Sequence, residues 1–186
     1  MKLPKNAKLV FKGQIFEVYQ WEQKNYDGSI SIFEGLKRPG TIQIIPSRGE
    51  QIFLSFEEQP TKPLSYTFLG GRQEDGEDPE VTAKRELLEE AGLSSDDWEL
   101  LKIYESEGKI DWNIYLYLAR NCQKVAQPKL DPGEKIEVKA VSFENFLKII
   151  DSEKFWGKTI ANDIHKLTHS PQLLQEFKER LFKAKI

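Results

Sequence analysis

Three glutamates, Glu86, Glu89 and Glu90, share about one turn of a segment with helical spacing. Residues three and four apart are neighbours on a helix, and like charges there repel by roughly a few tenths of a kcal/mol per pair. Hard divalent ions such as Mg²⁺ take oxygen ligands from carboxylates and backbone carbonyls, so a cation would relieve this repulsion. The preceding Gly70-Gly71 turn can bring a bare carbonyl close to the same point. The spacing therefore favours a metal site, with a solvated, glutamate-rich helix surface as the alternative.

The whole stretch around these glutamates has a fixed order of residue types. Gly71 is followed after five residues by Glu77, after seven more by Arg85-Glu86-Leu87, and then by Glu89-Glu90 and Gly92-Leu93. This pattern resembles the signature of the Nudix hydrolases at every specified position. The resemblance implies hydrolysis of a pyrophosphate bond in a nucleoside diphosphate linked to another moiety, with a divalent metal that is usually Mg²⁺ or Mn²⁺. It also implies an α/β/α sandwich around a mixed sheet, which is an α+β fold class.

Carried over position by position, the resemblance implies a role for each charged residue of this signature. Glu86, Glu89 and Glu90 are expected to hold the metal, with the carbonyl of Gly70 as a further ligand. Arg85 and Glu77 are expected to brace the loop against the helix, so that Glu77, Arg85 and Glu89 belong to the catalytic machinery. A surface arginine paired only with its helix neighbours is the alternative for Arg85.

The N-terminal segment resembles the extra β-domain of the ADP-ribose and nucleoside-diphosphate-sugar pyrophosphatases. The similarity rests on Phe11–Val18, Asp27-Gly28 and Arg38-Pro39-Gly40. It implies ADP-ribose or a nucleotide sugar as substrate, and a homodimer built through this domain with exchanged strands. We expect residues 1–40 to form a β extension for dimerisation and residues 41–186 to form the catalytic domain with C-terminal helices. The alternatives are a pyrophosphatase for nucleoside triphosphates or dinucleoside polyphosphates, and a nucleotide-sensing module without turnover.

In that branch of the family a catalytic glutamate lies on a loop after the signature. Asp131–Val138 is similar to this loop, so Glu134 is the candidate base. Glu137 is the runner-up, and a solvated turn glutamate is the alternative for Glu134. Those enzymes often carry a Gln-x-Arg stretch on the strand before the signature, whereas Phe56–Pro60 has no arginine. The cations that can substitute are Arg38, Arg48, Lys62 and Arg72, each of which is otherwise a surface charge.

Recognition of a nucleobase requires an aromatic face for stacking. The candidates are Trp21, Tyr26, Phe33 and Trp112, with core or interface packing as the alternative for each. The expected substrate-binding set is Arg38, Trp21, Arg72 and Trp112.

Residue patterning predicts the elements that must position these groups. Strands are expected over 9–21, 29–36, 41–46, 51–56, 65–69, 98–106, 111–120 and 135–141, and polar loops over 57–63 and 121–133. A helix is expected to begin after the N-cap Asp78, with Pro79 in its first turn, and to end at Gly92. Further helices are expected over 143–150, 159–167 and 173–185.

Composition excludes several classes of protein. The chain has 186 residues, of which 39% are hydrophobic and 31% charged, and a net charge of −3, so nucleic-acid binding is not favoured. We expect no membrane segment, because no apolar run approaches the roughly 18 residues that a spanning helix needs, and no signal peptide. The single cysteine, Cys122, cannot form an internal disulfide, which favours a reducing cytoplasm. His165 and His169 are expected to be structural or exposed.

Overall fold

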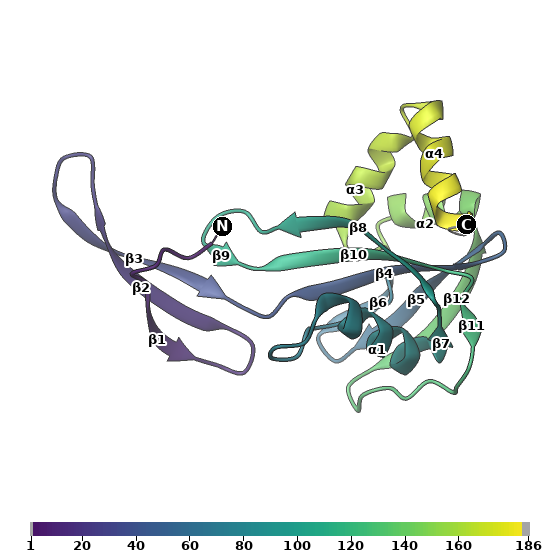
Figure 1. Cartoon of the computed structure of the whole chain (residues 1–186), viewed down its shortest axis with the longest axis horizontal. Coiled ribbons are helices and arrows are strands. Elements are labelled where there is room, and N and C mark those ends of the chain that lie inside the picture. Colours follow the sequence, from purple (N-terminus) through teal and green to yellow (C-terminus); the bar gives the residue numbers. More distant parts are fainter. Residues whose placement is uncertain (1, 184–186) are drawn as a thin grey trace.

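The chain folds into a layered body from which a narrow arm of strands extends (Figure 1). The computed structural model describes residues 2–183. The strands are β1 (Lys8–Lys12), β2 (Glu17–Lys24), β3 (Ile30–Lys37), β4 (Thr41–Arg48), β5 (Gln51–Gln59), β6 (Lys62–Thr67), β7 (Leu93–Ser94), β8 (Asp97–Glu105), β9 (Ile110–Asp111), β10 (Asn113–Arg120), β11 (Gln123–Lys124) and β12 (Lys135–Ser142). The helices are α1 (Pro79–Ala91), α2 (Phe143–Asp151), α3 (Lys158–Leu167) and α4 (Pro171–Phe182).

The body is built around one mixed sheet. Its strands follow the order β12-β5-β4-β10-β8, and β6 pairs with β5 at the side of this path. β4 and β10 are parallel, whereas β10 pairs with β8, and β5 pairs with β12 and β6, in the antiparallel sense. The mixture of parallel and antiparallel pairs confirms the expected mixed sheet.

Alternating residues of the central strands build a core on each face of this sheet. On β4, Ile45 belongs to a core that includes residues of α2, α3 and α4, whereas the adjacent Ile44 belongs to a core that includes Leu87 of α1. Successive side chains on a strand point to opposite faces, so α1 and the C-terminal helices must cover opposite sides. Figure 1 shows the same arrangement, which confirms the expected α/β/α sandwich.

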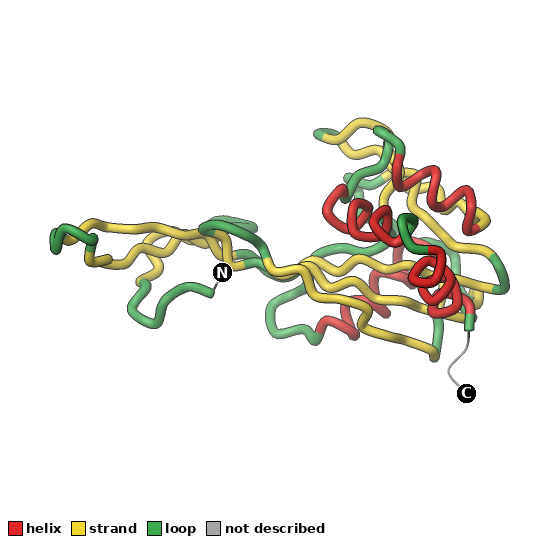
Figure 2. Tube along the Cα trace, turned by 90° about the horizontal axis from the view of Figure 1, so that it is seen from above, coloured by secondary structure: helices red, strands yellow, loops and turns green. Residues whose placement is uncertain are grey.

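The arm is a second sheet with the order β1-β2-β3-β9. Figure 2 shows that it consists of strands and loops, with the helices confined to the body. The expectation of one strand over 9–21 is wrong, because the chain reverses between β1 and β2. Gly13 N donates to Phe16 O over 2.8 Å in this turn, and a Cβ at Gly13 would lie 3.1 Å from that oxygen. The apolar and aromatic composition predicted strand correctly but did not reveal the turn.

The expectation of a loop over 57–63 is also wrong. β5 continues through the polar residues up to Gln59, and β6 begins at Lys62 after a short turn. The ladder shifts register between Glu57 and Gln59, which accommodates Pro63 because a proline has no N–H to donate. Pairing of β5 with β12 from Gln51 to Glu58 stabilises this polar strand end.

The remaining elements differ from expectation mainly at their ends. α1 agrees with the expected helix: Asp78 accepts a bond from Glu80 N over 2.8 Å, and Gly92 ends the helix with φ 59°. β10 begins at Asn113 rather than two residues earlier, and the expected loop over 121–133 contains the short strand β11. α4 runs over Pro171–Phe182, and the last two residues of the expected helix lie outside the described residues. Within residues 2–183, no helix is long and apolar enough to cross a membrane.

Candidate active site

The two glycines after β6 allow the backbone to pass unusually close to β4 and α1. Gly70 has φ 131°, and a Cβ there would lie 2.3 Å from the carbonyl oxygen of Ile42. A Cβ on Gly71 would lie 2.4 Å from Oε1 of Glu86. The Gly71 carbonyl accepts a bond from Ile42 N over 2.8 Å, so the Gly70 carbonyl remains the candidate metal ligand of the pair. Only glycine fits between β4 and the carboxylates of α1.

Arg85 ties the loop before α1 to the helix itself. Its Nε and Nη2 donate to the two carboxylate oxygens of Glu77 over 3.1 and 3.2 Å, and Nη2 also donates to Arg72 O over 3.2 Å. Glu77 accepts a further bond from Thr82 Oγ1 over 2.8 Å. The Arg85 guanidinium lowers the pKa of Glu77 to about 2, so this carboxylate stays ionised at neutral pH. The two-pronged ion pair fixes the loop relative to the helix.

The remaining nitrogen of Arg85 faces two of the clustered glutamates. Nη1 donates over 2.9 Å to Oε1 of Glu86 and over 2.9 Å to Oε2 of Glu89. Burial nevertheless raises the pKa of Glu86 to about 7, because the nearby arginine offsets only part of the cost of removing a charge from water. Glu89 is the most accessible of the group, with 44% of its side chain exposed.

Glu90 lies deepest in the cluster. Its Oε2 accepts a bond from Gly70 N over 2.7 Å, and only 5% of the residue is exposed. Burial raises its pKa well above the usual value, and the neighbouring carboxylates of Glu86, Glu57 and Glu134 raise it further. Ile136 of β12 pairs with Glu57 of β5, so Glu134, two residues before Ile136, lies at the same end of the sheet as Glu57.

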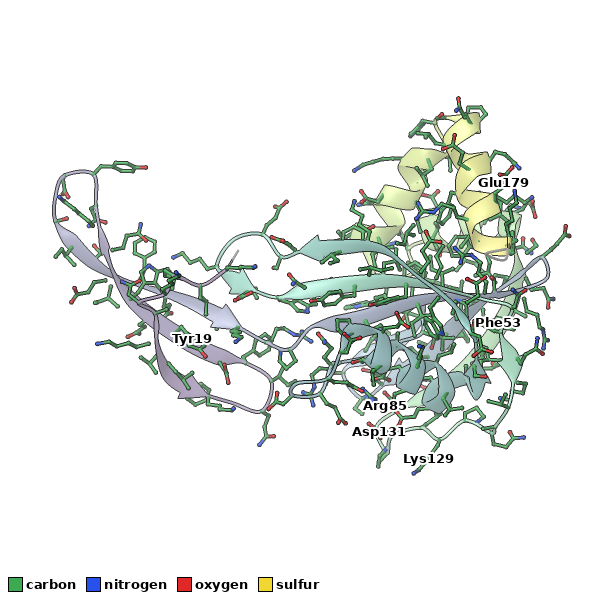
Figure 3. The ribbon with its side chains drawn as sticks, viewed as in Figure 1. Tyr19, Phe53, Arg85, Lys129, Asp131 and Glu179 are labelled. Atoms are coloured by element: carbon green, nitrogen blue, oxygen red, sulfur yellow. The ribbon has the colours of Figure 1, made fainter. Side chains whose placement is uncertain are left out.

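The loop that carries Glu134 is tied to the C-terminal half of α1. Lys129 N donates to Glu89 O over 2.7 Å, and Asp131 N donates to Oε2 of Glu134 over 3.2 Å. Figure 3 shows Lys129 and Asp131 on this loop and Arg85 on the neighbouring helix. Burial raises the pKa of Glu134 above its usual value. Glu137, the runner-up, lies on β12 with 66% of its side chain exposed and pairs with Lys139.

Sequence reasoning missed Glu57, which lies on β5 with 4% of its surface exposed. It forms an ion pair with Lys62 over 2.5 Å and accepts a bond from Ser55 Oγ over 2.9 Å. The alternation of Phe53, Ser55 and Glu57 would have placed this carboxylate on the α1 side, had the strand been extended past Phe56. Reading the acidic residues after Phe56 as a loop hid this signal.

The expected substrate-binding residues fall into two places. Arg38 lies over the ring of Trp112, with its guanidinium carbon 4.6 Å from the ring centroid, and both side chains donate to Thr41 Oγ1. Thr41 also forms a β-bridge with Arg72, so these three expected residues meet at the junction of arm and body. A cavity of about 290 Å³ between the arm and the loop before α1 lies against Arg38. Trp21 packs against Phe33 on β2 and β3, in the arm.

The carboxylate cluster fits a divalent cation by the chemistry of its donors. Carboxylate and carbonyl oxygens are the ligands of hard cations, and buried carboxylates that repel one another gain most from such an ion. Within the described residues, no three His, Cys, Asp or Glu side chains already converge on one point. Arg85 draws Glu86 and Glu89 toward its guanidinium, so these two carboxylates would have to turn to hold a metal together with Glu90.

Comparisons with known proteins identify the family of this chain. The model of the NUDIX domain family matches residues 37–161. The ADP-ribose pyrophosphatase of Bacillus subtilis (strain 168) is 31% identical over 165 residues, which cover 85% of this chain and 88% of that protein. The methanol dehydrogenase activator of Bacillus methanolicus is 29% identical over 157 residues, covering 81% of this chain and 84% of that protein.

A solved structure described as an ADP compounds hydrolase has the same fold. It superposes with a TM-score of 0.69 at 18% identity and covers 93% of this chain and 91% of its own. The family model spans more than half of the present chain, and the carboxylates, the arginine and the glycines of the signature are all in place. The chain therefore belongs to the Nudix family of hydrolases, which cleave pyrophosphate bonds with the help of a divalent metal.

Proposed function

We propose that the chain hydrolyses ADP-ribose or a nucleotide sugar, giving a nucleoside monophosphate and a sugar phosphate. The observation that carries this proposal is the close approach of the Gly70-Gly71 turn to Glu90 and Glu86 of α1, with the loop of Glu134 tied to the same helix through Lys129 N and Glu89 O. The similarity to a protein named ADP-ribose pyrophosphatase over most of both chains supports the substrate class.

Glu86, Glu89 and Glu90, with the Gly70 carbonyl, would hold Mg²⁺, and Mn²⁺ suits the same oxygen donors. When bound, the ion supplies neutralisation of the substrate's phosphate charge and of the repulsion among the glutamates. The ion pair of Arg85 and Glu77 holds the loop in a fixed position relative to the helix, so the metal ligands stay in place. Glu134 accepts the proton of the attacking water, since its raised pKa moves it toward the range useful for a general base at neutral pH.

The junction of arm and body supplies a second part of the substrate site. Arg38 and Arg72 are close enough for their charges to oppose one another, and burial together with Arg72 lowers the pKa of Arg38. Nε of Arg38 is buried and has no hydrogen-bond partner among the described residues. An anionic or aromatic substrate group would satisfy this guanidinium and stack beside Trp112, so we assign the nucleotide half of the substrate to this junction.

A homodimer through residues 1–40 belongs to the same proposal. The arm exposes several large apolar side chains, and its outer strand β1 leaves one edge unpaired within the described residues. These side chains are Leu9, Val10, Phe11, Ile30 and Ile32. Contiguous apolar surface and an open strand edge are features of interaction sites.

The reaction is tested by release of phosphomonoester from a panel of substrates, each with and without Mg²⁺. The panel contains ADP-ribose, nucleotide sugars, dinucleoside polyphosphates and nucleoside triphosphates, and Glu90→Gln is the control. We expect Mg²⁺-dependent cleavage of the diphosphate-linked sugars. Cleavage restricted to triphosphates or dinucleoside polyphosphates would reassign the substrate, and silence from folded, Mg²⁺-binding protein would favour a module without turnover. Gel filtration at micromolar concentration tests the dimer, and a monomer there would count against the ADP-ribose assignment.

A further inference from the structure

A short segment after α2 extends the sheet beyond β6. Tyr66 N donates to Lys154 O over 2.8 Å, and Trp156 N donates to Tyr66 O over 2.7 Å, so Tyr66 and Phe155 form a parallel bridge. Phe155 packs into the core that includes α2, α3 and α4. Because adjacent residues on an extended segment point to opposite faces, Trp156 faces the side of α1.

The irregular pairing of β5 with β6 brings two more polar side chains to that side. Ser65 pairs directly with Glu57, and Lys62 pairs with Gln59, so one extra residue of β6 is accommodated between these pairs. This bulge changes the alternation, which places Lys62 and Ser65 on the same face as Glu57 although they are three residues apart. We call Glu57, Lys62, Ser65 and Trp156 the edge cluster.

Two members of the edge cluster, Ser65 and Trp156, have a polar atom or a ring face that a ligand could contact. Ser65 is 6% exposed, and its Oγ is buried without a hydrogen-bond partner among residues 2–183. A buried hydroxyl left unpaired costs about 1–3 kcal/mol, which a ligand hydroxyl would recover. The Nζ of Lys62 lies 5.2 Å from the ring centroid of Trp156 and 2.5 Å from Glu57 Oε1. Trp156 itself is 58% exposed, so one face of its ring is open.

The edge cluster adjoins the catalytic carboxylates. The chain runs from Ser65 of β6 to Gly70, whose N–H donates to Oε2 of Glu90 over 2.7 Å, and Ile136 of β12 pairs with Glu57, so Glu134, two residues before Ile136, lies at the same end of the sheet. A diphosphate bound at Glu86 and Glu90 would therefore have its next chemical group beside the edge cluster. In ADP-ribose and nucleotide sugars, that next group is a sugar. The junction at Arg38 and Trp112 lies by β4 and β10, whereas the edge cluster lies by β5 and β6, so the two places suit opposite halves of one substrate.

We propose that the edge cluster binds the sugar phosphate half of the substrate. Lys62 contacts the phosphate, Glu57 and Ser65 hydrogen-bond the sugar hydroxyls, and Trp156 packs against the apolar face of the sugar ring. Lys62 thereby takes the place of the arginine that Phe56–Pro60 lacks. This inference rests on the proposed function, because it identifies the second half of that substrate.

Equilibrium binding of the two product halves tests the inference without turnover. Ribose 5-phosphate and AMP are titrated separately, with Mg²⁺, into the unmodified chain, Trp156→Ala, Lys62→Gln and Ser65→Ala. We expect the Kd of ribose 5-phosphate to rise about tenfold or more in Lys62→Gln, as for a lost charge-assisted bond. We expect a several-fold rise in Trp156→Ala and Ser65→Ala, while the Kd of AMP is unchanged in all three variants.

Two controls separate binding from folding. Leu64 lies on the same strand, is 49% exposed and points to the opposite face, so Leu64→Ala should leave both Kd values unchanged. Ser65→Ala removes a hydroxyl with no partner, so it should preserve or raise the Tm while weakening ribose 5-phosphate binding. Lys62→Gln leaves Glu57 buried without its cation, so a loss of folding there makes Trp156→Ala and Ser65→Ala the deciding variants.

The outcomes distinguish this inference from the proposed reaction. If diphosphate-linked sugars are hydrolysed but ribose 5-phosphate binds equally to Trp156→Ala and Ser65→Ala, the assignment of the edge cluster is overturned and the reaction stands. Loss of AMP binding in place of ribose 5-phosphate binding also overturns it, because Trp156 would then hold the nucleobase. A third outcome is that no substrate of the panel is hydrolysed, but ribose 5-phosphate binds more weakly to the variants than to the unmodified chain. This would overturn the proposed reaction, while the edge cluster would remain a sugar phosphate site.

Discussion

Two groups of carboxylates in this protein have opposite electrostatic surroundings. At one end of the sheet, Asp97 and Glu99 surround the buried Arg120, and Arg180 of α4 also pairs with Glu99. Burial raises the pKa of Glu99, but the hydrogen bonds from Arg180 and Arg120 outweigh it and hold the pKa below its usual value. Glu99, which pairs with both Arg120 of β10 and Arg180 of α4, therefore joins α4 to the sheet.

At the catalytic site the number of cations falls short of the number of carboxylates. Arg85 already forms its two-pronged pair with Glu77, and one nitrogen serves both Glu86 and Glu89. Glu90 has a single backbone N–H from Gly70, and burial raises its pKa well above the usual value. Carboxylates that arginines match stabilise the fold, whereas carboxylates without a matching cation in the chain are suited to bind one from solution.

Replacing the deepest carboxylate should have the largest effect on turnover. In Glu90→Gln the amide has nearly the same shape as the carboxylate, and its oxygen can still accept the hydrogen bond from Gly70 N. The substitution removes one negative charge from the metal ligands. We expect kcat to fall roughly a thousandfold, which corresponds to about 4 kcal/mol. The metal-free variant should unfold at a higher temperature than the unmodified chain, because a buried charge without a matching cation has been neutralised. Undiminished turnover at saturating Mg²⁺ would remove Glu90 from the metal site.

The matched group should respond in the opposite way. Arg120→Met removes the buried cation that pairs with the partly buried Asp97 and Glu99, so we expect a loss of about 3 kcal/mol in the free energy of unfolding. Urea unfolding followed by circular dichroism measures this loss. The kcat of the folded fraction should stay within about twofold of the unmodified value, since the Arg120 side chain contacts Asp97 and Arg180 of α4, whereas the adjacent Ala119 faces the side of α1. A large fall in the kcat of the folded fraction would contradict the assignment of Arg120 to stability alone.

Glu134 separates the role of proton acceptor from that of metal ligand. For Glu134→Gln we expect a fall of about 10–100-fold in kcat, in the range of a lost general base, with little change in the affinity for Mg²⁺. Rates measured across pH 5–9 should lose the lower inflection that the unmodified chain shows. An unchanged kcat would move the base to Glu137 or to a glutamate of α1.

The two groups also differ in how far the sequence reveals them. The glutamates of α1, Arg85 and the Gly70-Gly71 turn follow from local spacing, since one helix and one turn position them all. Glu57 could not be predicted in the same way, because its strand end is polar and depends on pairing with β12. Lys62 is one of four candidate cations, and the sequence does not distinguish it from the others. Trp156 depends on a single bridge to Tyr66, which no local pattern encodes. Sheet pairing therefore places side chains that local spacing does not reveal, whereas the helix places its side chains by spacing alone.

The pH dependence of stability is the smallest of the expected effects, but its direction follows directly from the pKa shifts. Burial raises the pKa of Glu86 to about 7 and that of Glu90 well above its usual value, so the folded chain binds more protons than the unfolded chain between about pH 4.5 and 7. Stability of the metal-free chain should therefore fall as pH rises through this window. Glu77, whose pKa Arg85 lowers to about 2, contributes a loss only as pH falls below about 4.5.

Thermal unfolding at pH 5.5 and 7.5, each with EDTA or with Mg²⁺, measures this dependence. We expect the Tm in EDTA to be a few degrees lower at pH 7.5, since 1 kcal/mol shifts the Tm of a chain of this size by roughly 2–4 °C. Mg²⁺ should raise the Tm more at pH 7.5 than at pH 5.5, because the ligands must be ionised to bind it. Glu90→Gln should show a smaller dependence on both pH and Mg²⁺, whereas Arg120→Met should keep both. Equal Mg²⁺ stabilisation at the two pH values would mean that protons and metal do not compete for these carboxylates.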